Sequence, residues 1–174
     1  MAWRIHTHHQ GPSQQEQKET EAYRAQKLRE YKATEEKEKG NAQYKKGKCL
    51  AAIACYTRAI EHDPSNAVYP ANRAMAHLKM KQYKKAVEDC TIAVKLDKKY
   101  TKAWLRRATA LVGMGCLEDA VPDFEHVLKL DPKNANAKKE LASKSVHPLV
   151  SLRSGLMSHE DTDLELVPKP AEVV

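Results

Sequence analysis

Five polar side chains in the middle of this 174-residue sequence have the types and the spacing that a carboxylate-binding site requires. Lys37 and Asn41 are four residues apart, and so are Lys102 and Arg106, so each pair shares one face of a helix. Asn72 lies between the two pairs along the chain. Ammonium, guanidinium and amide groups donate hydrogen bonds that a carboxylate cluster accepts well. Together they predict a clamp for a peptide's C-terminal carboxylate and a neighbouring Asp side chain.

Five further side chains near these positions are candidates for contacts with the part of such a peptide that precedes its carboxylate. They are Tyr44, Lys45, Met75, Lys79 and Thr109. Tyr44 and Met75 would serve equally well as core residues, and Lys45 and Lys79 as ordinary solvated lysines. We expect this second set to influence the choice between peptides.

The clamp residues converge only if a structural unit recurs along the chain, and the sequence has a period of 34 residues. Segments 33–66, 67–100 and 101–134 align without gaps. Position 8 of the repeat holds a small residue in each segment, namely Gly40, Ala74 and Ala108. Position 20 is also small, with Ala52, Ala86 and Ala120. Position 24 generally holds a larger residue, namely Tyr56, Cys90 and Phe124. Small residues at positions 8 and 20 let two helices approach closely, and the larger residue at position 24 is expected to fill the core beside them. This pattern is typical of stacked helical hairpins. Position 4 departs from this pattern, because Glu36 and Pro70 replace a large apolar residue that only Trp104 supplies.

The predicted fold is therefore all-α. We expect helices near residues 34–46, 50–62, 68–80, 84–96, 101–114 and 118–130, which form three hairpins. A capping helix over 135–144 would cover the apolar end of the array. The repeat domain would span 33–144 and form a right-handed α-solenoid.

The flanking segments have a different composition from the repeats. We expect residues 1–15 to be disordered and residues 16–32 to form a charged helical arm that continues into the first repeat, with a capping box between Ser13 and Glu16. Residues 145–174 mix Pro, Ser and acidic residues and are expected to form a disordered tail. The tail contains the apolar stretch VHPLVSLRSGLM, and we hypothesise that it recruits a second adaptor protein.

The stretches KEKGN at 37–41, NR at 72–73 and KAWLR at 102–106 resemble the dicarboxylate clamp of tetratricopeptide-repeat co-chaperones. The resemblance covers residues 33–144. It implies that Lys37, Asn41, Asn72, Lys102 and Arg106 hold the Glu-Glu-Val-Asp tails of the cytosolic heat-shock proteins 90 and 70. It also implies an adaptor role in the assembly of multi-protein complexes.

Other function classes have little support in the sequence. None of the eight histidines belongs to a recognisable catalytic constellation, and no phosphate-binding Gly loop appears, so we expect no enzyme and no cofactor. The four cysteines form no CxxC pair, which argues against a metal site. A net charge of +7 permits nucleic acid as a partner, but stacking aromatics and known nucleic-acid motifs are missing.

The sequence shows neither a signal-peptide pattern nor an apolar run long enough to span a membrane, so we expect a cytoplasmic protein that could also be nuclear.

One alternative function stays open for the same fold. The same fold could be a scaffold that recognises another acidic peptide or packs against a folded partner.

Overall fold

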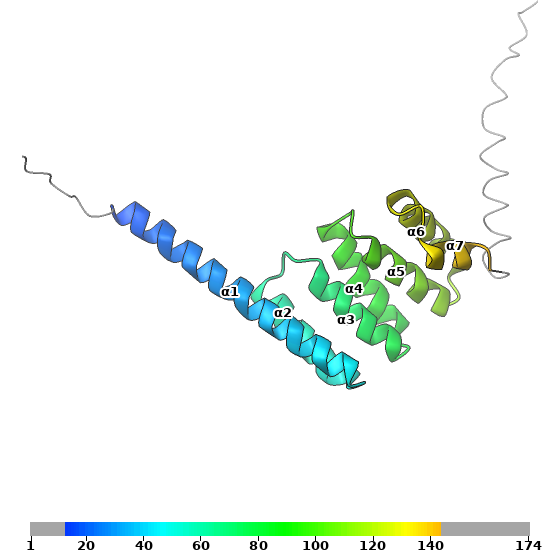
Figure 1. Cartoon of the computed structure of the whole chain (residues 1–174), viewed down its shortest axis with the longest axis horizontal. Helices are drawn as coiled ribbons and strands as arrows, with labels where there is room; N and C mark the ends of the chain where they lie inside the picture. The colour runs from blue at the N-terminus through cyan, green and yellow to red at the C-terminus, as the bar shows by residue number, and fades with distance from the viewer. Residues whose placement is uncertain (1–12, 144–174) are drawn as a thin grey trace, which may run out of the picture.

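The computed structural model describes residues 13–143, and this part of the chain contains seven α-helices and no strand. In chain order the helices are α1 (Gln14–Lys45), α2 (Cys49–His62), α3 (Val68–Lys79), α4 (Tyr83–Leu96), α5 (Thr101–Gly113), α6 (Leu117–Leu130) and α7 (Ala135–Leu141). They form three antiparallel hairpins that stack side by side along the molecule, followed by α7 (Figure 1).

The all-α fold and the hairpin arrangement predicted from the repeat are confirmed. The helices α2 to α6 begin and end within one residue of the predicted bounds. The cap is shorter than expected, since α7 ends at Leu141. Predictions for residues 1–12 and for the tail from residue 145 lie outside the described residues.

The first helix runs from the arm into the first repeat, as expected, but it starts earlier than predicted. It is continuous from Gln14 to Lys45, so the charged arm and the first repeat helix form one element, and it begins two residues before the predicted arm. The capping box explains this start: the Ser13 Oγ accepts from the Glu16 backbone N–H, and the Glu16 carboxylate accepts from the Ser13 backbone N–H at 2.6 Å. The arm extends beyond the first hairpin (Figure 1).

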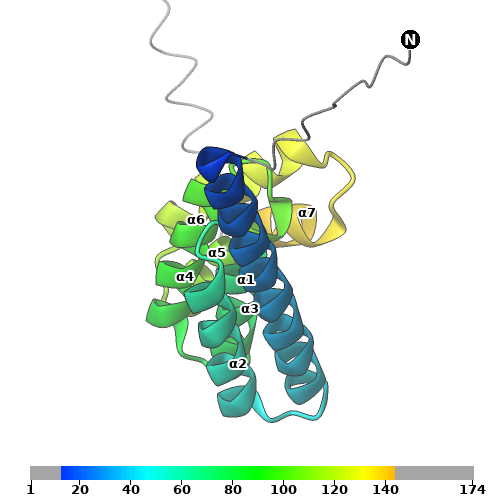
Figure 2. The same ribbon diagram turned by 90° about the vertical axis from the view of Figure 1, so that its left-hand side faces the viewer.

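Close contacts inside each hairpin depend on the small residues of the repeat. A Cβ atom on Gly40 would lie 2.6 Å from the Cε1 atom of Tyr56, whose ring is fully buried between α1 and α2. Ala74 and Ala86 pack with Cys90 in the second hairpin. In the view turned by 90°, α1 and α2 lie side by side at one end of the stack (Figure 2).

The cap closes the other end of the stack. Ala137 of α7 is fully buried in one cluster with Ala108, Ala120, Phe124 and Val127 of the third hairpin. The apolar end of the array is therefore covered, as predicted for a terminal helix.

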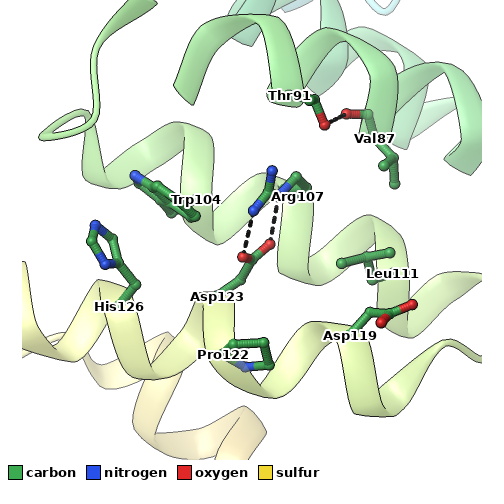
Figure 3. A pocket seen from close by; sticks show the side chains of 9 residues that line it. All are labelled: Val87, Thr91, Trp104, Arg107, Leu111, Asp119, Pro122, Asp123 and His126. Carbon is green, nitrogen blue, oxygen red and sulfur yellow. Dashed lines mark hydrogen bonds and ion pairs between the residues drawn. The ribbon is translucent and has the colours of Figure 1, made fainter. Parts of the chain in front are cut away.

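Ion pairs join the two helices of each hairpin. Arg73 and Asp89 pair through two hydrogen bonds of 2.9 and 2.6 Å, and the equivalent Arg107 and Asp123 pair through two of 2.7 Å. The latter pair crosses from α5 to α6 (Figure 3). In the first hairpin, Glu36 instead accepts a hydrogen bond of 2.6 Å from Arg58. The unusual Glu36 at position 4 is thus satisfied by an ion pair.

The turns within the three hairpins share one backbone feature. The residue at the same repeat position has a positive φ in each, 77° at Gly47, 58° at Lys81 and 80° at Gly115. Glycine adopts this left-handed conformation without steric cost, whereas lysine does not.

Candidate functional site

The first helices of the three hairpins, α1, α3 and α5, supply all ten predicted site residues. The 34-residue register relates several of them directly. Asn72 and Arg106 occupy the same repeat position, and Asn41, Met75 and Thr109 share another position three residues later. Equivalent positions on successive helices lie on equivalent faces, so the repeat presents these side chains to one side of the array.

Arg106 connects α5 to α3. Its Nη1 donates to the Ala71 carbonyl oxygen at 2.7 Å and to the Asn72 Oδ1 at 3.3 Å, and its Nη2 lies 3.3 Å from the Met75 Sδ. These acceptors are neutral, so they orient the guanidinium while its positive charge stays unneutralised. The structure thus brings together two of the predicted clamp residues and one of the predicted groove residues.

Asn41 is oriented by a residue that the sequence analysis assigned only to the core. The Tyr56 hydroxyl donates to the Asn41 Oδ1 at 2.9 Å, which directs the amide Nδ2 away from the tyrosine. Burial raises the pKa of Tyr56 to about 12, against the nearby positive charge of Arg106, so the hydroxyl remains a donor at neutral pH. Tyr56 therefore positions the side chain of the predicted clamp residue Asn41.

Glu38, which was not among the predicted site residues, contacts two of the predicted clamp residues. Its Oε1 lies 2.9 Å from the Lys37 Nζ and its Oε2 accepts from the Asn41 Nδ2 at 3.2 Å. The hydrogen bonds from Lys37 and Asn41 hold the pKa of this carboxyl below its usual value. The register could have revealed it, because Glu38 occupies the repeat position of Asn72 and Arg106.

The remaining predicted residues lie more loosely around the site. Lys102 is exposed in the first turn of α5, and its ammonium makes no hydrogen bond or ion pair within residues 13–143. The Lys79 ammonium lies 4.9 Å from the centre of the Tyr44 ring, a cation–π distance that brings these two groove candidates together. Lys45 and Thr109 are exposed, and the Thr109 hydroxyl donates to the Leu105 carbonyl oxygen. Lys45 follows Asn41 by one helical turn on α1.

The charge of the site favours an acidic ligand. The helices α3 and α5 contain no acidic residue, whereas both contain Lys or Arg side chains. Glu38 is thus the one acid that bonds to a predicted clamp residue within the described chain. Surfaces with this excess of one charge attract ligands of the opposite charge.

A pocket with a volume of about 530 Å³ lies elsewhere, between α4, α5 and α6 (Figure 3). Its lining includes Trp104, Arg107, Asp123 and His126, and none of the predicted site residues. Arg107 and Asp123 pair with each other, and the Trp104 and His126 rings lie 4.2 Å apart. Because its guanidinium is already paired with a carboxylate, this pocket is not suited to hold a second one.

Metal centres and membrane-spanning helices have no support in the part of the chain that the structure describes. In residues 13–143 no group of three or more His, Cys, Asp or Glu side chains could hold a metal ion. Across the same residues, no helix combines the length and apolar character needed to cross a bilayer.

Comparison with known families agrees with the repeat. Models described as tetratricopeptide repeat match residues 37–103 and residues 101–134. Curated relatives include RNA polymerase II-associated protein 3 from Homo sapiens, 46% identical over 138 residues, which are 79% of this chain and 19% of the relative. The protein of that name from Xenopus laevis is 47% identical over 110 residues, 63% of this chain and 17% of the relative. The chain thus spans about a fifth of the length of these relatives.

Two solved structures are similar over most of the described chain. One is the first tetratricopeptide domain of Spaghetti, an RNA polymerase II-associated protein 3, bound to a heat-shock protein 90 peptide, SRMEEVD. It has 40% identity and a TM-score of 0.64, and the match covers 72% of this chain and 98% of that one. The other is the second such domain of human RNA polymerase II-associated protein 3 with a heat-shock protein 70 peptide, SGPTIEEVD, at 43% identity, a TM-score of 0.63 and the same coverage.

The hairpin architecture, the matching repeat models and these solved domains agree on one conclusion. The chain belongs to the tetratricopeptide-repeat family and resembles its co-chaperone domains.

Proposed function

We propose that this chain is a co-chaperone adaptor that binds the C-terminal Glu-Glu-Val-Asp peptides of heat-shock proteins 90 and 70. Lys37, Asn41, Asn72, Lys102 and Arg106 form its carboxylate clamp. The chain acts by binding, not by catalysis, and works in the cytoplasm or nucleus, where those chaperones meet their partners during complex assembly.

The observation that carries this proposal is the set of donors on α1, α3 and α5. Arg106 is held by neutral acceptors beside Asn72, and Asn41 is oriented by the Tyr56 hydroxyl. The Lys102 ammonium is exposed and has no partner within residues 13–143. Several donors presented to one side of the array suit a ligand that has two carboxylates close together. The two similar domains were solved with peptides that both end in Glu-Glu-Val-Asp, which supports the same choice of ligand.

The first test is a calorimetric titration with the peptides SRMEEVD and SGPTIEEVD, each with a free and with an amidated C-terminus. We expect a dissociation constant on the order of micromolar, about 8 kcal/mol of binding free energy, for the free acids. Amidation removes the C-terminal carboxylate, which is one of the two that the clamp would hold. We therefore expect it to weaken binding at least tenfold.

The second test removes single donors. Lys102→Ala and Arg106→Ala should each weaken binding by roughly 1.5 to 3 kcal/mol, because a charge-assisted hydrogen bond is lost. Lys84→Ala is the matched control, since Lys84 is an exposed lysine on α4 and its loss changes the net charge equally. Equal affinities for Lys102→Ala, Lys84→Ala and the unchanged chain would contradict the clamp.

The amidated peptides distinguish the clamp from the main alternative, a scaffold for other acidic peptides or for a folded partner. A groove that recognises acidic peptides in general, or a folded partner, does not require the terminal carboxylate. Binding that is unchanged by amidation would therefore replace the clamp with a general acidic-peptide scaffold on the same fold.

A further inference from the structure

Glu38 occupies a position where the two later repeats have donors. The residue 34 positions after it is Asn72, and the next in register is Arg106. The repeat thus directs Glu38 to the same side of the array as two predicted clamp residues, but with the charge of the ligand.

The contacts of Glu38 use both of its carboxylate oxygens. One lies 2.9 Å from the Lys37 Nζ and the other accepts from the Asn41 Nδ2 at 3.2 Å. These are the two clamp donors that α1 supplies. The Tyr56 hydroxyl occupies the Oδ1 of Asn41, so the Nδ2 that bonds to Glu38 is the group that an incoming carboxylate would need.

The other half of the site is arranged differently. Arg106 bonds to a backbone carbonyl, an amide oxygen and a thioether sulfur, all of them uncharged. Among the clamp candidates, Lys37 and Asn41 are the two that bond to an acid within residues 13–143. The Glu38 side chain is 62% exposed, so it can rotate into solvent without unpacking the helix.

We propose that Glu38 is an internal competitor of the peptide, whose carboxylate occupies Lys37 and Asn41 in the free chain and must leave when a peptide carboxylate binds. The proposal rests on the proposed function. On binding, the carboxylate of the peptide replaces that of Glu38 at these donors, so Glu38 lowers the affinity for the peptide.

The expected size of the effect follows from the exposure of the pair. Exposed ion pairs contribute little, so loss of the competing carboxylate should tighten peptide binding about two- to fivefold. Because the competition is electrostatic and solvent-exposed, the gain should shrink as salt is raised from about 50 to 500 mM.

The experiment titrates SRMEEVD into the unchanged chain and into Glu38→Gln, Glu38→Ala and Glu35→Gln at both salt concentrations. Glu38→Gln removes the charge, and Glu38→Ala also removes the group that occupies the donors. Glu35→Gln is the matched control, because Glu35 lies on the same helix and pairs with Lys39 at 2.9 Å, outside the site. We expect tighter binding for both Glu38 variants and little change for Glu35→Gln.

The other outcomes separate this inference from the proposed function. If the unchanged chain binds and the Glu38 variants bind equally or more weakly, Glu38 does not compete and only the inference fails. A gain of the same size in Glu35→Gln would also overturn it, since net charge alone would explain the result. If neither the unchanged chain nor any variant binds, the proposed function fails and the competition fails with it.

Discussion

The ion pair between Arg73 and Asp89 should be a main determinant of stability in the second hairpin. The Asp89 side chain is 6% exposed and accepts both hydrogen bonds from the guanidinium, while the Arg73 Nη1 also donates to the Thr57 hydroxyl at 3.0 Å. Asp89→Ala would leave a largely buried guanidinium with one neutral partner. Breaking a buried pair in this way destabilises a protein by about 3 to 5 kcal/mol.

We expect Asp89→Ala to lower the free energy of unfolding by about 3 kcal/mol, the lower end of that range, because Arg73 is 21% exposed. For a domain of this size the melting temperature should fall by roughly 10 °C. Urea and thermal unfolding followed by circular dichroism at 222 nm would measure both quantities. Glu35→Ala serves as the control: both partners of its ion pair are 51% exposed, so its loss should cost less than about 1 kcal/mol.

A second variant tests whether the pair itself is responsible. Replacing both partners, Arg73→Met with Asp89→Leu, removes the charges together and leaves no unpaired ion, so it should be much less destabilising than Asp89→Ala alone. A loss below 1 kcal/mol for Asp89→Ala would refute the reasoning. So would a double variant that is as unstable as the single one.

Three further outcomes follow from local features. Gly40→Ala should destabilise the fold by about 1 to 3 kcal/mol in urea unfolding, because its Cβ would press on the buried Tyr56 ring, and adding Tyr56→Leu should recover part of that loss. Lys81→Gly should raise the free energy of unfolding by up to about 1 kcal/mol, since the φ of 58° is strained for lysine; no gain would argue against strain there. Burial raises the pKa of Cys90 to about 12, so its neutral thiol stabilises the native state below the unfolded pKa, and this contribution should be lost between about pH 8.5 and 12. Stability measured across that range should fall with pH, and less steeply in Cys90→Ala.

The repeat allowed much of the fold to be predicted, because small residues such as Ala74 and Ala86 recur at a fixed period and determine where helices approach. The capping box at Ser13 was also visible in the sequence, and it explains the true start of α1. The predicted start of the arm at residue 16 was nevertheless two residues late, although an N-cap at Ser13 places the first helical residue at Gln14.

Pairings across the hairpins were harder to predict. Glu36 looked like a missing apolar contact, but Arg58 lies 22 residues away and satisfies it through an ion pair. Local periodicity does not show which long side chains meet between two helices. The same reason hid Tyr56, whose ring was correctly assigned to the core while its hydroxyl supports Asn41.

Glu38 was missed for another reason. Groups that attract carboxylates define the predicted clamp, so an acid within the same stretch was not included, although the register with Asn72 and Arg106 pointed to it. A repeat position predicts the direction of a side chain regardless of its charge.

The uninterrupted α1 makes the arm a mechanical extension of the first repeat. The 19 residues from Gln14 to Lys32 rise about 28 Å at 1.5 Å per residue, with no break before the helix enters the hairpin. A tilt of about 10° in the hairpin would therefore displace the tip of the arm by about 5 Å. A spectroscopic label near Gln14 would therefore report small rotations of the first hairpin as larger displacements.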